Sequence, residues 1–339
     1  MKKTLLIAAI IIFSLPLAAC RPRPTLTIYA PADSISFSVI RSFESQHRVN
    51  ITLNTYRSPD EIQRQLANIT YDLVIAPDFE IARMRVEDTI MPLDFTQIPN
   101  ANLIDDEFRL PNDRFTVPYM FTTLGILYNA DKIVEEEDAH TWQVLWNPRY
   151  AESIIMTSNV REGIAIGLLA TESSINSKDF YEIDVARVAL QRQRRFVWNY
   201  QSIDAGANMV ANRAAIAVMH SHEASRAIAR NPALNFVIPE EGSVKTIHSF
   251  VIPRNAQQET LALQFIDYIT STSVSASNFE IIQAQPVNRE VRPLLPLELR
   301  NSTVIFTPSA QLARSEFFDY DVEAMRMYQQ AWLQVRATR

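Results

Sequence analysis

The sequence of 339 residues is long enough for two domains of ordinary size, and its 47% hydrophobic and 21% charged residues favour a packed core over disorder. The formal net charge of −6 argues against binding nucleic acid through a general basic field. The five glycines form neither a Walker loop nor a GxGxxG motif, and the sequence contains no GxSxG or HExxH, so the usual nucleotide-binding and hydrolase motifs are missing.

Residues 1–19 have the layout of a secretory signal peptide, with a basic start, an apolar run and small residues before Cys20. The segment resembles a bacterial lipoprotein signal, in which the cysteine thiol is acylated and becomes the first residue of the mature chain. The apolar stretch ends near Pro16, short of the ~20 residues that a membrane span needs. We therefore expect an extracytoplasmic protein, periplasmic or on the cell surface, that is anchored to the membrane by lipid on Cys20 through a tether of residues 20–24. Because Cys20 is the only cysteine, the mature protein would have no free thiol for a disulfide, a redox centre or a cysteine–zinc site.

The first part of the mature chain alternates strand-like and helix-like segments. Short apolar runs bounded by turn residues predict strands, and apolar residues at helical spacing predict helices. The predicted strands are 26–29, 49–53 and 72–76, and the predicted helices are 35–46, 59–67 and 79–86. This βαβαβ order favours an open, mostly parallel sheet with helices on both faces.

A second α/β series follows the first. Its predicted strands are 125–128, 153–156, 214–219, 236–239 and 249–252, and its predicted helices are 142–146, 161–170, 223–229, 258–270 and 325–335. The fold class is therefore α/β, and neither an internal repeat nor a low-complexity tract interrupts it.

Six short motifs lie in a fixed order along the mature chain. They are Tyr71–Val74, Val117–Tyr119, Trp142–Tyr150, Thr157–Glu162, Val251–Ala256 and Pro286–Asn288. Together they resemble the spermidine/putrescine-binding family of ABC-transporter substrate-binding proteins, within the type II periplasmic-binding-protein superfamily. The ordered set covers nearly all of the mature chain and is more specific for the fold than for the ligand.

The resemblance implies two α/β lobes that are joined by hinge strands and close around a ligand, each lobe a mixed, mostly parallel sheet flanked by helices. It places residues 25–125 plus 249–300 in lobe one, and residues 126–248 plus 301–339 in lobe two. It further implies a monomer without a cofactor that delivers a small, polyamine-like ligand to an ABC permease and its ATPase, and that is neither an enzyme nor a nucleic-acid-binding protein.

A polyamine requires carboxylates for its terminal ammonium groups and aromatic walls along its methylenes. By the resemblance, Glu162 matches the ammonium-binding glutamate of the family. The spacing between Asn159 and Glu162 is also that of a capping box, in which Glu162 would reach back to the Asn159 N–H, so both roles stay open. Asn159 stands where the family often has an aspartate, and His248 stands where it has a central aspartate. A protonated His248 would repel an amine, so we expect affinity to fall as the pH drops through ~6.5 if His248 faces the ligand.

The remaining candidate ligand-binding residues replace or retain family positions at the expected cleft. His220 occupies an aromatic wall position, and Asp319 stands where an amide often sits and could restore a negative charge. The other candidates are Phe121, Phe79, Asp78 and Asp33. Aspartates in loops are more often exposed turn or N-cap residues than ligand contacts, so this alternative stays open for the acidic loop residues.

Two alternatives to polyamine capture remain open. His220, His222 and His248 fall in segments expected at the cleft and could coordinate a transition metal with Glu162 or Glu223, although a lone histidine is more often a satisfied polar residue. The same fold could also bind a different small solute or present a bound ligand to a membrane signalling partner. The sequence contains no nucleophile–base arrangement that would indicate an enzyme.

Overall fold

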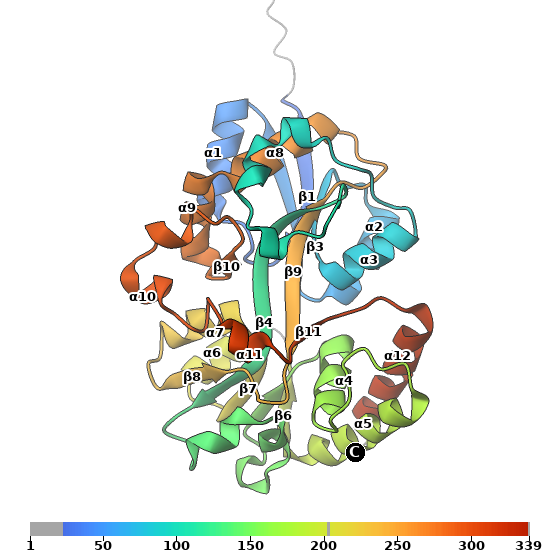
Figure 1. The fold of residues 1–339 in the computed structure, drawn as a ribbon, viewed down its shortest axis with the longest axis vertical. Helices are drawn as coiled ribbons and strands as arrows, with labels where there is room; N and C mark the ends of the chain where they lie inside the picture. Colours follow the sequence, from blue (N-terminus) through green and yellow to red (C-terminus); the bar gives the residue numbers. More distant parts are fainter. Residues whose placement is uncertain (1–22, 202–203, 338–339) are drawn as a thin grey trace, which may run out of the picture.

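The computed structural model describes residues 23–201 and 204–337. The signal segment and Cys20 therefore lie outside the described residues. Within the described part, a single eleven-stranded sheet runs along the long axis of the molecule (Figure 1). Its main path has the strand order β2-β1-β3-β9-β4-β7-β5-β6, while β8 and β10 pair with β4 and β11 pairs with β9.

One half of the molecule is built on the first three strands, which are mutually parallel. These strands are β1 (Thr25–Pro31), β2 (Asn50–Tyr56) and β3 (Leu73–Pro77), joined late in the chain by β10 (Gln285–Pro286). The helices of this half are α1 (Phe37–His47), α2 (Ile62–Asn68), α3 (Asp78–Val86), α8 (Glu259–Thr270), α9 (Thr272–Ile282) and α10 (Leu297–Arg300). In Figure 1 they cover the sheet on both sides. The expected βαβαβ unit is thus confirmed.

The other half contains the strands from the middle of the chain and the C-terminal elements. Its strands are β5 (Ile154–Met156), β6 (Val197–Tyr200), β7 (Ile216–His220), β8 (Leu234–Val237) and β11 (Glu316–Phe317). Its helices are α4 (Val160–Leu169), α5 (Phe180–Gln193), α6 (Ala205–Val210), α7 (Ser221–Ile228), α11 (Ser309–Leu312) and α12 (Val322–Ala337). Helix α5 and strand β6 fall in a stretch where the sequence analysis predicted neither.

Two long central strands connect the halves. Strand β4 (Val117–Asn129) pairs with β9 (Val244–Val251) along its first part and with β7 along its second part. The sequence analysis predicted only residues 125–128 of β4 and only the end of β9. All 13 residues of β4 are buried, so the strand has no polar face and lacks the alternation that marks a half-exposed strand. Antiparallel pairing is confined to this centre, and parallel pairing lies on either side of it.

Separate hydrophobic clusters stabilise the two halves. One lies between β1, β3, α1 and α8 and contains Phe43 and Phe265, whose rings meet edge to face at 5.0 Å. The other lies between β4, β5, β7, α4 and α12 and contains Trp142 and Trp332. A Cβ atom on Gly163 would collide with the ring of Trp332, so this glycine allows α12 to pack directly on α4.

Some residues of the ordered motifs have structural roles. The buried Asp72 accepts hydrogen bonds from the backbone N–H groups of Thr27 (2.9 Å), Gln257 (2.9 Å) and Gln258 (2.9 Å). It thereby joins strand β1 to the start of α8. The buried Trp142 donates its indole N–H to the Gly242 carbonyl at 2.9 Å. The predicted helix at 142–146 is a 3-10 turn.

Candidate ligand-binding cleft

A cavity of about 610 Å³ lies between the two halves, at the carboxyl ends of several strands. The loops after β1 and β2 line one side of it, and the starts of α4, α6 and α7 line the other. Met120 of β4 and His248 of β9 contribute from the central strands. This is the place where open α/β sheets bind ligands, because strand ends and helix N-termini converge there.

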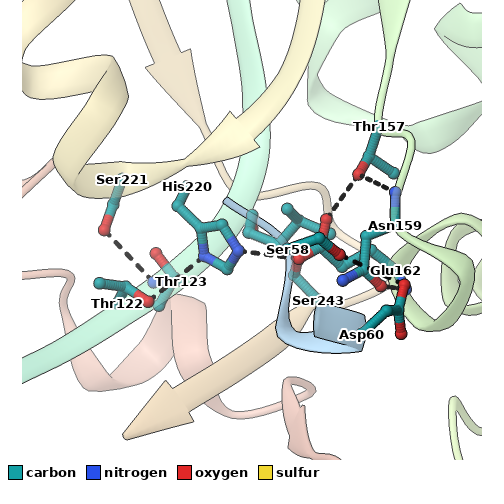
Figure 2. A network of polar contacts seen from close by, with 11 residues as sticks. Ser58, Asp60, Thr122, Thr123, Thr157, Asn159, Glu162, His220, Ser221 and Ser243 are labelled. Atoms are coloured by element: carbon teal, nitrogen blue, oxygen red, sulfur yellow. Dashed lines mark hydrogen bonds and ion pairs between the residues drawn. The ribbon is translucent and has the colours of Figure 1, made fainter. Parts of the chain in front are cut away.

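Glu162 places a carboxylate in this cavity from the first turn of α4. Its Oε1 lies 3.0 Å from Nε2 of His220, and its Oε2 accepts a 2.6 Å hydrogen bond from the Thr157 hydroxyl (Figure 2). Thr157 directly follows β5, and His220 is the last residue of β7. Two adjacent parallel strands therefore end at the two partners of the carboxylate.

Only one half of the predicted capping box forms. The Glu162 N–H donates to Asn159 Oδ1 at 3.0 Å, which makes Asn159 the N-cap of α4. The Asn159 N–H donates to Thr157 Oγ1 at 3.1 Å rather than to Glu162. The capping role considered for the Glu162 side chain is therefore wrong. Its carboxylate contributes to the cleft, and the caps at this helix end come from Asn159 and Thr157.

The electrostatics of the cleft centre on the Glu162–His220 ion pair. The Glu162 and His220 side chains are only 13% and 19% exposed, so little water competes with their interaction. Burial alone would lower the pKa of His220, but the charge and hydrogen bond of Glu162 outweigh it and raise that pKa. Burial likewise opposes ionisation of Glu162, but His220 and the Thr157 hydroxyl outweigh it, so the pKa of Glu162 is lowered. Each partner thus favours the charged form of the other.

The two other cleft histidines are neutral. Burial lowers the pKa of His222 well below its usual value, with help from the charge of Arg226. Burial lowers the pKa of His248 to about 3, with a smaller effect from His220. The buried Nδ1 atoms of both have no hydrogen-bond partner among the described residues. The expectation that protonation of His248 near pH 6.5 would govern affinity is therefore wrong, and His220 is the histidine that is poised to titrate.

The cleft is also lined by charged residues that the sequence analysis did not consider as ligand contacts. They are Arg57, Asp204, Arg226 and Arg230. Glu223, considered earlier only as a metal ligand, also lines it, and burial raises the pKa of its carboxyl. Asp60 lies near Glu162 (Figure 2) and accepts a hydrogen bond from the Ser58 hydroxyl. Burial raises the pKa of Asp60, and the Glu162 charge adds to that increase. Arg57, Asp60 and Asp204 come from separate loops or turns, so their spacing along the sequence gave no signal, whereas Glu223, Arg226 and Arg230 follow one another at helical spacing on and just after α7.

The structure brings some of the predicted ligand-binding residues together at the cavity. They are Asp33, Asn159, Glu162, His220 and His248. Phe121 lies elsewhere, because alternate residues of a strand face opposite ways. Its neighbour Met120 lines the cavity, while the Phe121 ring packs at a tilt against Phe108 in the core, with the ring centres 5.4 Å apart.

The other three predicted residues also lie outside the cavity lining. The Phe79 ring is buried edge-on against Phe318. The Asp78 carboxylate accepts the N–H groups of Phe79 (2.8 Å) and Ile247 (3.3 Å) at the start of α3. Asp319 is exposed, and its backbone carbonyl accepts a 3.4 Å hydrogen bond from Arg161. Asp78 therefore binds backbone N–H groups at the start of α3, while Pro77 is the N-cap residue of this helix.

A metal site at the three histidines finds no support in the geometry. Within residues 23–201 and 204–337, histidine, cysteine, aspartate and glutamate side chains form no group of three or more that could hold a metal ion. The rings of His220 and His222 are 5.9 Å apart, and His220 is already engaged by Glu162.

A cleft between two α/β halves that share central strands defines a receptor for small solutes. The bacterial extracellular solute-binding protein family matches residues 67–301, and the chain belongs to this family. The family binds solutes and does not comprise enzymes, so the protein is an extracytoplasmic solute-binding protein. None of the helices among the described residues has the length and apolar character to cross a membrane.

Curated relatives and solved structures resemble nearly the whole chain. The spermidine/putrescine-binding periplasmic protein of Salmonella typhimurium is 24% identical over 99% of this chain and 98% of its own length. The putrescine-binding periplasmic protein PotF of Escherichia coli is 23% identical over 92% of this chain and 91% of its own. A spermidine/putrescine ABC transporter substrate-binding protein of Streptococcus pneumoniae has a TM-score of 0.80 at 26% identity, covering 93% of this chain and 99% of that one. A Listeria monocytogenes protein of 27% identity reaches a TM-score of 0.89, with coverage of 93% and 99%.

Proposed function

We propose that the protein captures spermidine, putrescine or a related small amine in the cleft between its halves. The observation that carries the proposal is the Glu162 carboxylate, which is held inside the cavity by Thr157 and is largely withdrawn from water. An ammonium that enters a dry site needs such a charge-assisted acceptor to offset the loss of its hydration. The similarity to spermidine/putrescine-binding proteins over nearly the whole chain supports the same ligand class.

Closure of the two halves would let a membrane partner distinguish the ligand-bound protein from the free protein. Residues 25–125 plus 249–300 would form one lobe and residues 126–248 plus 301–339 the other, and the lobes would close around the amine as a hinge motion of β4 and β9. The closed monomer would then be recognised by an ABC permease and its ATPase. Acylation of Cys20 would keep the receptor near these membrane partners, and the mass of protein extracted from membranes tests for the acyl groups.

Calorimetry on Glu162 variants tests the amine proposal. Spermidine and putrescine should bind the purified wild-type protein, and 1,4-butanediol, which has no ammonium, should not. Glu162→Gln removes the charge but keeps the shape, and should weaken spermidine binding by about tenfold to a hundredfold, the usual effect of losing a charge-assisted hydrogen bond. Glu298→Gln removes an exposed carboxylate of α10 and should bind as the wild type does. Absence of binding by both amines would refute the proposal.

A second candidate ligand is a small amine that also carries an acidic group. Arg57, Arg226 and Arg230 line the cavity, whereas Tyr56 is the one phenylalanine, tyrosine or tryptophan among the described lining residues. Guanidinium groups favour carboxylate or phosphate, and the shortage of aromatic walls is unfavourable for a bare polyamine. A preference for amino acids or phosphorylated amines over spermidine in the same calorimetric panel would select this candidate.

A further inference from the structure

The Glu162–His220 ion pair occupies the place that a ligand ammonium needs. Both carboxylate oxygens are already engaged, Oε2 by the Thr157 hydroxyl and Oε1 by His220 Nε2 at 3.0 Å. An ammonium that reaches Oε1 would therefore meet an imidazolium bound to the same atom. Two cations so close together in a poorly hydrated site repel each other strongly.

We propose that capture of an amine at Glu162 expels one proton from His220, so that the cleft exchanges a built-in cation for the cation of its ligand. The proposal rests on the proposed function for the choice of an amine. The net charge at Glu162 would be the same before and after binding, since the His220 proton leaves to solvent as the ammonium arrives. The proton can leave because the His220 side chain keeps 19% of its surface exposed.

Thr122 provides the geometry that the neutral imidazole would need. Its hydroxyl lies 3.3 Å from His220 Nδ1, on the opposite side of the ring from Glu162 (Figure 2). After the Nε2 proton is lost, the remaining proton on Nδ1 can be donated to the Thr122 hydroxyl. The lone pair on Nε2 then points toward the ammonium, which can donate to both Glu162 Oε1 and His220 Nε2. The residue that blocks the amine at low pH would thus become one of its acceptors.

The other charged groups around the pair do not replace His220 as the proton donor. His222 of α7 and His248 of β9 both have lowered pKa values and are neutral at the pH at which His220 titrates. Glu223 and Arg226, also on α7, support the imidazolium instead of replacing it: the Glu223 charge raises the pKa of His220, and Arg226 favours the ionised form of Glu223. Asp60, from the other half of the molecule, faces Glu162 rather than His220.

The pH dependence of spermidine binding tests the exchange. The three ammonium groups of spermidine repel one another, which lowers the pKa of the central one below that of a lysine side chain, but all three stay protonated below pH ~7.5. Any change in affinity between pH 5.5 and 7.5 therefore arises in the protein. Wild-type affinity should rise by up to tenfold per pH unit until His220 is deprotonated in the free protein, and should then level off. Calorimetry in buffers with different ionisation heats should show the release of up to one proton at the low end of this range.

Two variants assign the effect to His220. His220→Gln has no proton to expel, so its affinity should be independent of pH and its proton release zero. His222→Gln removes the neighbouring neutral imidazole and should keep the wild-type pH slope, whatever its effect on affinity. A wild-type affinity that is constant across the range, or a slope that persists in His220→Gln, would overturn the exchange while leaving amine capture intact.

A measurement on the free protein separates the failure of this inference from the failure of amine capture. The His220 imidazole resonance should titrate at a higher pH in the wild type than in Glu162→Gln, because the pair is present without ligand. Equal titration in both would overturn the exchange whether or not spermidine binds. If spermidine fails to bind the wild type and His220→Gln at every pH, both amine capture and the exchange are refuted.

Discussion

Single residues at the cleft edge show how similar side chains take different roles. Glu162 and Asp78 both follow the end of a strand and both lie in the first turn of a helix. The Glu162 carboxylate is turned to the cavity because Asn159 and Thr157 cap its helix. Helix α3 has Pro77 as its N-cap and no side-chain cap, and the Asp78 carboxylate accepts the Phe79 N–H in the first turn and the Ile247 N–H of β9. The local partners, rather than the residue type, decide which acid is available to a ligand.

The buried Asp78 should make the stability of the protein depend on pH. Burial outweighs its two backbone hydrogen bonds and raises its pKa to about 7. An unfolded aspartate ionises near pH ~3.9, so between about pH 4 and 7 the folded state binds the extra proton. The stability that Asp78 contributes is therefore greatest at low pH and falls as the pH rises through this window, by up to ~1.4 kcal/mol per unit.

The comparison of wild type with Asp78→Asn in urea isolates this contribution. The free energy of unfolding of the wild type relative to Asp78→Asn should decline from pH 4 to 7 and stay constant above about pH 8. A difference that does not change over this range would show that Asp78 ionises freely in the folded protein.

At the scale of secondary-structure elements, the packing of α12 on α4 depends on one glycine. Gly163→Ala should destabilise the protein by about 1–3 kcal/mol, because the new methyl group would overlap the buried ring of Trp332 and force the two helices apart. Gly206→Ala is the matched control, since it adds the same methyl group to a helix where the nearest atom, Ala227 Cβ, is 3.7 Å away. It should be neutral or more stable by up to ~1 kcal/mol, because alanine favours helices. Urea denaturation of both variants measures their free energies of unfolding. Equal values for the two variants would contradict the close contact between Gly163 and Trp332.

The success of sequence reasoning also differs between elements. The βαβαβ unit was predictable because β1 and β3 are short apolar runs flanked by helices with a clear apolar side. Helix α5 was missed because only Ile183 and Leu190 on its buried side are large apolar residues, and β6 because it is a four-residue edge strand without a fully buried side chain. In the cleft, Glu162 could be found from its motif, whereas its pairing with His220 depends on the sheet order that places β5 beside β7.

At the scale of the whole molecule, the strands that carry the cleft also connect the halves. Strands β4 and β9 contribute Met120 and His248 to the cavity and continue into both halves of the sheet. Each half has its own large hydrophobic cluster, and Phe79 of α3 packs across the boundary against Phe318 in the cluster of the other half, so a rotation about the central strands would leave most of both cores intact and shift this one contact. We expect such a joint to allow rigid-body closure, and a ligand that touches both sides of the cavity would favour the closed form.

Closure should therefore be visible as a compaction that depends on the ligand. Saturating spermidine should reduce the radius of gyration of the wild type in small-angle X-ray scattering, because an amine between Glu162 and the loops after β1 and β2 draws the halves together. Glu162→Gln, measured at the same spermidine concentration, should be compacted less than the wild type because it is only partly bound, and raising that concentration until the variant saturates should restore the full compaction. If calorimetry shows the wild type to be saturated and its radius of gyration is unchanged, the halves do not close on the ligand. The cleft would then be a preformed site, and a membrane partner would have to recognise the bound amine itself rather than a closed shape.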